Sequence, residues 1–223
     1  MATSAASPFD ALFAKYAGAI PRDYLRALAY RESAFRPDIV HPTSRATGLF
    51  QITSTALASF NQRNHTGLVL ANLTDPELNT RVAAQHLAGV INVYRRYRST
   101  QPDWKSSRWV ELLTLGWNAG HNAIATIVGK MEASGIPPDR ITVDSVSQVA
   151  AGLGTGKYVA DPARVAWSKS VAALYLGGGP AAPKGLYASM VPGTRGGGGG
   201  ALFVVALLIA GAIALVAKKG EGR

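Results

Sequence analysis

An uninterrupted apolar segment near the end of the 223-residue chain limits the possible folds more than any other feature. Residues 201–217 read ALFVVALLIAGAIALVA and contain no charged or strongly polar side chain. As a helix this segment is about 26 Å long, close to the roughly 30 Å hydrocarbon core of a bilayer. The sequence therefore predicts a single C-terminal transmembrane helix. The alternative is a buried helix of a globular core.

The composition changes on both sides of this segment. Residues 177–200 are rich in Gly and Pro, which predicts a flexible linker that is stiffer near its prolines. Residues 218–223 form a short basic tail that begins with two lysines. The rest of the chain, residues 1–176, has the length of one ordinary globular domain.

The apolar residues of this domain recur mostly at helical spacing, which predicts a mainly α-helical fold. Hydrophobic residues make up 48% of the chain and support a packed core, and the absence of Cys excludes disulfides and thiolate catalysis. Thr74 and Glu77 stand at capping-box spacing around Pro76, so they predict the start of a helix. Residues 38–53 are rich in Pro, Ser and Thr and predict a loop of short strand pairs or irregular turns.

Glu32 is the strongest candidate for catalysis, because it ends a predicted amphipathic helix. It follows Leu25 by seven residues and Leu28 by four, so it lies on the apolar face. Loss of water there favours the neutral acid and raises the pKa, and the helix dipole acts in the same direction. A protonated carboxyl near neutral pH is what a general acid for glycoside cleavage needs. The alternative is a structural Glu that faces solvent or pairs with Arg36.

Several motifs surround Glu32 in a recognisable order. They are ESAF at residues 32–35, GLFQ at 48–51, LTDPELN at 73–79, WNAG at 117–120 and KYV at 157–159. Together they resemble the motifs of the lytic transglycosylase family of lysozyme-like enzymes. The resemblance covers roughly residues 9–176, which is almost the whole predicted domain.

The resemblance implies a lysozyme-like α-helical fold and an activity on peptidoglycan. The family cleaves the β-1,4 bond between N-acetylmuramic acid and N-acetylglucosamine and closes a 1,6-anhydro ring on the muramyl residue. Glu32 would serve as acid and then as base, and Ser33 would orient it. The implied substrate-binding residues are Ser33, Gly48, Leu49, Gln51, Trp117, Asn118 and Tyr158. Gly48 in particular would let the backbone approach the sugar closely, and the alternative is an ordinary turn glycine. No cofactor and no metal is implied.

Two residues depart from the family pattern. Trp117 stands where the family usually has Tyr, so an aromatic wall is kept but the hydroxyl is lost. His41 stands where the family usually has Ser. A local hydrogen bond in a surface loop is its expected role, and a contact with the substrate is the alternative.

Other function classes fit the sequence less well. A hydrolytic muramidase is the alternative within enzymes, and a membrane-anchored, wall-binding structural protein with an inactive site is the alternative outside them. The net charge of +10 favours polyanionic partners in general. No sequence-specific nucleic-acid partner is expected, because no motif for one is present. The four histidines show no metal-ligand spacing.

The location of the protein is inferred from the predicted transmembrane helix at residues 201–217. The first sixteen residues lack the pattern of a secretory signal, so the catalytic domain is expected to stay on the side of the membrane where it is made. A bacteriophage particle, with the protein in its internal membrane, would deliver the domain to the wall. Glycan strands, lipid and other virion proteins are then the expected partners. The alternative location is the bacterial inner membrane, facing the periplasm.

Overall fold

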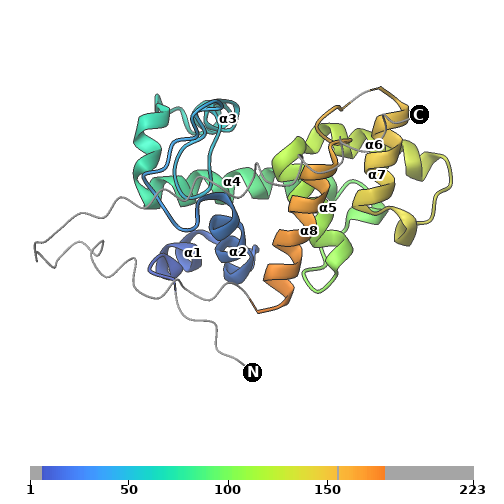
Figure 1. Ribbon diagram of the computed structural model, residues 1–223, viewed down its shortest axis with the longest axis horizontal. Helices are drawn as coiled ribbons and strands as arrows, with labels where there is room; N and C mark the ends of the chain where they lie inside the picture. Colours follow the sequence, from blue (N-terminus) through green and yellow to red (C-terminus); the bar gives the residue numbers. More distant parts are fainter. Residues whose placement is uncertain (1–6, 155, 179–223) are drawn as a thin grey trace, which may run out of the picture. The chain divides into compact units, whose positions relative to one another are not determined.

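The computed structural model describes residues 7–154 and 156–178, and these residues form a mainly α-helical domain, as the sequence predicts (Figure 1). The α-helices are α1 (Asp10–Tyr16), α2 (Arg22–Ser33), α3 (Ser54–Asn64), α4 (Pro76–Tyr94), α5 (Ser107–Ala119), α6 (His121–Ala133), α7 (Val143–Gly152) and α8 (Pro162–Leu176). Short 3-10 helices lie between them: η1 (Leu70–Thr74), η2 (Arg98–Thr100) and η3 (Pro138–Arg140).

The predicted transmembrane helix at residues 201–217 and the predicted basic tail lie outside the described residues, as does nearly all of the predicted linker. Among the residues that are described, no helix is both long enough and apolar enough to cross a bilayer.

The long helix α4 connects the two groups of helices in this domain. It contacts α1, α3 and η1 on one side of the fold, and α5 and α6 on the other. In Figure 1 it runs between α1–α3 and the cluster of α5, α6, α7 and α8. Side chains that project from different faces of α4 can therefore reach both groups.

The start of α4 differs from the prediction. Asp75, not Thr74, caps the helix, because its Oδ1 accepts a hydrogen bond from the backbone N–H of Leu78 at 2.8 Å. Thr74 instead belongs to η1, and its hydroxyl donates to a backbone carbonyl within that turn. The N-cap therefore lies one residue later than predicted, because η1 continues directly up to Asp75, and the cap is a single side-chain hydrogen bond rather than a capping box.

Helix α2 is held in place by an ion pair in its first half and by a tight turn at its end. Near its start, Arg26 donates from Nε and Nη2 to the two carboxylate oxygens of Asp10, at 2.8 and 2.6 Å, which ties α2 to α1. At its end, Ala34 and Phe35 adopt left-handed backbone angles, with φ of 51° and 63°. Such angles are unfavourable for residues other than glycine, and here the tight turn carries Phe35 into the core, where it is fully buried.

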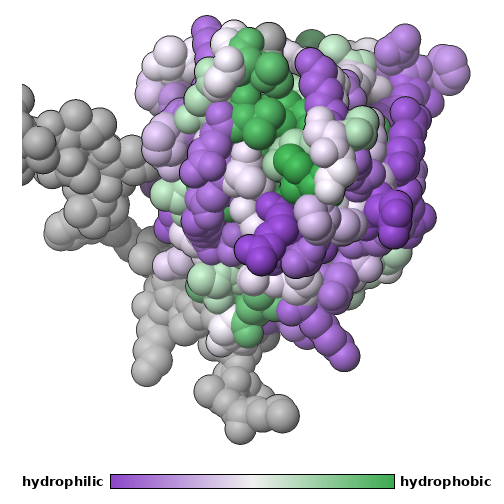
Figure 2. Space-filling model, turned by 90° about the vertical axis from the view of Figure 1, so that its right-hand side faces the viewer, coloured by the Kyte–Doolittle hydropathy of each residue, from purple (hydrophilic) through white to green (hydrophobic). Residues whose placement is uncertain are grey.

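The loop at residues 38–53 contains only isolated antiparallel bridges, between Val40 and Thr47 and between Thr47 and Ile52. Of the two predicted alternatives, irregular turns therefore describe the loop better than a short strand pair. The core of the domain holds large buried side chains from several helices, among them Tyr24, Tyr94 and Trp109. Figure 2 shows one face of the surface, where hydrophilic residues surround smaller apolar patches.

Candidate active site

Glu32 lies in the last turn of α2 and is partly buried. Its Oε1 accepts a hydrogen bond from the indole Nε1 of Trp117 in α5, at 2.7 Å. Burial raises the pKa of Glu32 to about 7, although the Trp117 hydrogen bond and the positive charges of Arg31 and Arg164 act in the opposite direction. The carboxyl group is therefore protonated in a large fraction of molecules near neutral pH, as its place on the apolar face predicts.

The indole of Trp117 is held between two other aromatic rings. The ring of Phe50 meets it edge-on at 6.5 Å between centroids, and the imidazole of His86 meets it at 5.3 Å, with interplanar angles of 68° and 71°. Edge-to-face packing of this kind fixes the orientation of an aromatic ring. The direction of the indole N–H towards Glu32 therefore does not depend on one hydrogen bond alone.

Ser33 follows Glu32 but uses its hydroxyl within the helix. The side chain is buried, and its Oγ donates to the backbone carbonyl of Ala29 at 3.2 Å. The single hydroxyl proton is thus engaged in stabilising the last turn of α2.

The loop that carries GLFQ is clamped by Asn79 of α4, which is fully buried. Its Nδ2 donates to the backbone carbonyls of Thr47 and Leu73, at 2.8 and 2.9 Å, and its Oδ1 accepts from the backbone N–H of Phe50 at 2.9 Å. One side chain therefore satisfies three buried backbone groups, two in the loop on either side of Gly48 and one in η1.

The packing of the folded protein requires a glycine at position 48. Its φ is +82°, and an added β-carbon would overlap the side chain of Asn79 and the backbone carbonyl of Leu73. The side of Gly48 that lacks a side chain therefore faces the clamp. The close packing against Asn79 and Leu73 is therefore a sufficient reason for glycine at this position.

The next residues of the motif differ in their exposure. Leu49 is fully buried, so its side chain belongs to the core. Gln51 is partly exposed and has a left-handed φ of 46°. Its Nε2 donates to the backbone carbonyls of Ile39 and Gly48, at 3.2 and 2.9 Å, while its Oε1 has no hydrogen-bond partner among the described residues. The free oxygen of Gln51 is an acceptor that a substrate could use.

Asn118 and Tyr158 are brought together by Arg164 of α8. The Nη1 of Arg164 donates to both the side-chain and the backbone oxygen of Asn118. The same guanidinium lies over the ring of Tyr158, 4.8 Å from its centroid, and Tyr158 is 51% exposed. The charge of Arg164 also acts on Glu32. Asn118, Tyr158 and Arg164 therefore lie in the same region of the molecule as Glu32.

Three residues of this region were not identified from the sequence. A sequence motif did point to Asn79, since this residue ends LTDPELN. Arg164 resembles any solvated arginine three residues after Asp161, with which it forms an ion pair at 3.6 Å. His86 lies at an ordinary helical position, and nothing local to it points to Trp117.

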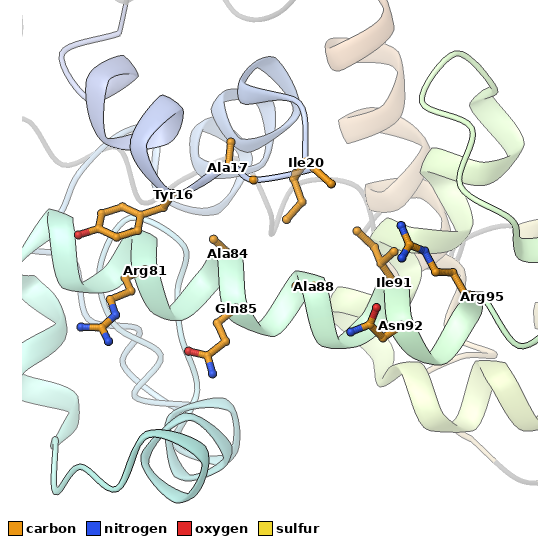
Figure 3. Close-up of a pocket in the computed structure, with 12 residues that line it drawn as sticks. Tyr16, Ala17, Ile20, Arg81, Ala84, Gln85, Ala88, Ile91, Asn92 and Arg95 are labelled. Carbon is orange, nitrogen blue, oxygen red and sulfur yellow. The ribbon is translucent and has the colours of Figure 1, made fainter.

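Two surface pockets lie apart from this region. One, of about 340 Å³, lies between residues 16–20 and α4. In Figure 3 Ala84 and Ile91 project from α4 towards Ala17 and Ile20. The other, of about 500 Å³, lies between residues 97–98 and residues 129–138. Neither is lined by Glu32 or Trp117. Among the described residues, no group of three or more His, Asp or Glu side chains is arranged to hold a metal ion.

Comparison with known proteins bears on this arrangement. The family model of the Transglycosylase SLT domain matches residues 11–136. No curated protein matches the chain. The solved structure of an inactive mutant of the lytic transglycosylase Slt from Pseudomonas aeruginosa superimposes with a TM-score of 0.52 and 17% sequence identity, over 78% of this chain and 25% of that one.

The 70 kDa soluble lytic transglycosylase from Escherichia coli is also similar, with 22% identity and a TM-score of 0.49, over 76% of this chain and 24% of that one. The chain thus spans about a quarter of the length of these two proteins. The similarity to the Pseudomonas protein shows that the two chains share a fold.

Proposed function

The chain belongs to the Transglycosylase SLT domain family, and from this premise we propose that it is a peptidoglycan lytic transglycosylase. The observation that carries the proposal is the state of Glu32. A partly buried carboxyl with a pKa of about 7, bonded to the indole N–H of Trp117, can both give and take a proton near neutral pH.

The proposed reaction uses this carboxyl twice. Glu32 first gives its proton to the oxygen of the β-1,4 bond between N-acetylmuramic acid and N-acetylglucosamine, and the bond from that oxygen to the muramyl anomeric carbon breaks. The Glu32 carboxylate then takes the proton of the muramyl 6-hydroxyl, whose oxygen bonds to the same carbon and closes the 1,6-anhydro ring. Glu32 ends in its starting state, and no water is consumed.

Trp117 supports both steps. Because Oε1 of Glu32 accepts the indole N–H, Oε2 is the oxygen better placed to carry the acidic proton. After proton transfer, the same hydrogen bond stabilises the carboxylate that remains. The arrangement therefore favours proton exchange at one defined oxygen.

The charges around Glu32 favour this route over hydrolysis. Glycosidases that use water or a covalent intermediate usually need two carboxylates, one on each side of the bond. The charged groups that act on Glu32 among the described residues are Arg31 and Arg164, both cationic. Asp75, a carboxylate in the motif at residues 73–79, is engaged as the cap of α4 and does not act as a second catalytic carboxylate in this proposal. The second nucleophile is then a hydroxyl of the substrate itself.

Mass spectrometry of the products tests this proposal. Purified peptidoglycan is incubated with the full-length chain, and the released muropeptides are weighed. Transglycosylation yields 1,6-anhydro products, whereas a hydrolytic muramidase yields products heavier by one water. Hydrolytic masses would overturn the proposed reaction while keeping Glu32 as the acid, and no release of fragments would overturn the enzymatic proposal.

We propose further that residues 201–217 attach the enzyme to a membrane and that a bacteriophage particle carries it, opening the wall locally while the genome is delivered. The support is the uncharged apolar run, joined to a wall-cutting domain by a Gly-rich segment. Zymography of purified particles, with and without detergent extraction, tests this. A protein that is absent from particles and exposed to the periplasm of uninfected cells would instead indicate an enzyme of the bacterial inner membrane.

A further inference from the structure

Three nitrogen-bearing side chains from three different helices gather beside Trp117. His86 of α4 contacts the indole, and the imidazole of His121 at the start of α6 lies 5.7 Å from that of His86. Arg63 of α3 completes the group, and its charge acts on both imidazoles. Its Nη1 lies 3.2 Å from the position that a β-carbon on Gly89 would occupy, so the glycine leaves space for the guanidinium against α4.

The donors of this cluster are largely unused. Within the described part of the chain, neither imidazole has a hydrogen-bond partner. Arg63 uses Nε on the backbone carbonyl of Ser59 at 3.1 Å, which leaves the N–H groups of its two terminal nitrogens. All three side chains are at least partly exposed to solvent. Polar groups that converge beside a reaction site without protein partners are suited to bind a ligand.

The charge of the cluster indicates what kind of ligand it suits. Burial lowers the pKa of His86 to about 4, with His121 and Arg63 adding to the effect. Burial and Arg63 also lower the pKa of His121. No carboxylate is among the groups that shift these two histidines. One permanent cation and two neutral imidazole donors therefore face the solvent together, and a carboxylate is the natural partner of a guanidinium.

Resting on the proposed function, we infer that Arg63, His86 and His121 form a subsite that binds a carboxylate of the wall polymer next to Trp117. The muramyl residues of peptidoglycan carry a lactyl group to which a short peptide is attached. Two carboxylates are therefore possible ligands, those of the peptide and the one that a lactyl group exposes when its peptide is absent. Either carboxylate would be held at a fixed place relative to the glycosidic bond that Glu32 protonates.

The test compares three forms of glycan strand with the full-length enzyme. They are strands with intact peptides, strands whose peptide carboxylates have been amidated, and strands from which the peptides have been removed. We expect the wild-type KM to be about tenfold lower on strands that carry the recognised carboxylate than on amidated strands, the size expected for a charge-assisted hydrogen bond. Tight binding of peptide-free strands instead of peptide-bearing ones would identify the lactyl carboxylate.

The variant Arg63→Gln should lose this preference, so that its KM values for the recognised and amidated strands become equal. His121→Asn should weaken the preference in the same direction. Arg140→Gln is the matched control, because Arg140 is a highly exposed arginine whose one ion pair among the described residues is with its neighbour Asp139, at 3.8 Å. A wild-type enzyme without any preference, or an Arg63→Gln variant that keeps it, would overturn the subsite.

Binding measurements separate this inference from the proposed function. Glu32→Gln protein is titrated with the same three kinds of strand, so no cleavage is needed. If the wild-type chain cleaves nothing but the Glu32→Gln protein still prefers carboxylate-bearing strands through Arg63, the subsite stands and the enzymatic proposal fails. If cleavage occurs and Glu32→Gln shows equal affinity for all strands, the subsite fails and the enzymatic proposal stands.

Discussion

The indole Nε1 of Trp117 lies 2.7 Å from Oε1 of Glu32, which joins the end of α2 to the end of α5 across 85 positions of sequence. Both ends are held independently, since α2 ends in a left-handed turn and the indole packs against Phe50 and His86. The distance between donor and acceptor is therefore a property of the folded core. Changes at either residue should alter the chemistry more than the fold.

Glu32→Gln should abolish cleavage of peptidoglycan while the fold is retained. The amide has nearly the same shape and can still accept the indole N–H, but it cannot supply the catalytic proton, so a loss of at least about a hundredfold is expected. Loss of turbidity of a peptidoglycan suspension measures the rate. Glu111→Gln is the matched control, because Glu111 is also a partly buried glutamate whose pKa burial raises. Residual activity above a few per cent would assign the acid to another residue.

The same variant should be more stable than the wild type at alkaline pH. The folded pKa of Glu32, about 7, lies above its ordinary value of 4.5, so the folded state binds the proton more tightly than the unfolded state. The contribution of Glu32 to stability is therefore full below about pH 4.5 and is lost as the pH rises through 7. The free energy of unfolding of Glu32→Gln should exceed that of the wild type increasingly over this range, by up to about 3 kcal/mol.

Denaturation with urea at several pH values between 4 and 9 measures this difference. It should grow from about pH 4.5 through 7 and level off roughly one pH unit above 7, where the wild-type residue is almost fully ionised in the folded state as well. A difference that is independent of pH would mean that Glu32 has an ordinary pKa in the folded protein.

Changes at Trp117 should move the pH dependence of activity. The indole hydrogen bond lowers the pKa of Glu32, so Trp117→Phe should raise that pKa and shift the alkaline decline of kcat/KM to higher pH. Trp117→Tyr keeps a donor and should retain substantial activity, whereas Trp117→Ala also removes the aromatic wall and should lose most of it. The profiles are measured on one substrate from pH 5 to 9. An alkaline limb that is the same in wild type and Trp117→Phe would contradict this role.

The helices were predictable because their periodicity is local. The apolar spacing before Glu32 predicts both the helix and a carboxyl with a raised pKa, and the structure has both. The start of α4 was misplaced by one residue, since an adjacent Thr and Asp are both good caps and only the preceding 3-10 turn decides between them.

The partners of the site residues were not predictable in this way. Arg164 reaches Asn118 across 46 positions, and His86 reaches Trp117 from a different helix, so neither contact leaves a local pattern. Ser33 and Gly48 stand in motifs next to Glu32 and Phe50, but the surroundings of these two residues depend on tertiary contacts. Family resemblance supplies a position in a motif, and only the packing shows which way each residue faces.

Asn79→Ala should destabilise the loop over the site. The change leaves the backbone groups of Thr47, Leu73 and Phe50 buried without their partner, which costs on the order of 2–4 kcal/mol. Asn92→Ala is the matched control, because Asn92 lies on the same helix and is exposed. Urea denaturation compares the two variants. Equal stabilities would show that water replaces the Asn79 hydrogen bonds without loss.

Gly48→Ala tests whether the clamp or the backbone angle requires glycine. Gly18 and Gly48 both have positive φ, +56° and +82°, so alanine at either position carries a conformational penalty of roughly 1–2 kcal/mol. Only at Gly48 does the new β-carbon meet buried atoms, those of Asn79 and Leu73, whereas at Gly18 it meets nothing within 4 Å.

Gly18→Ala should therefore be destabilised only by the conformational penalty. It should keep its activity, because Gly18 lies away from Glu32. Gly48→Ala should lose about 2–4 kcal/mol more, since either the loop or α4 must move to admit the methyl group. Its activity should fall as well, because the loop also carries Phe50, which holds Trp117. Similar losses of stability in the two variants would show that the loop yields easily, and the clamp of Asn79 would then not fix the position of Phe50.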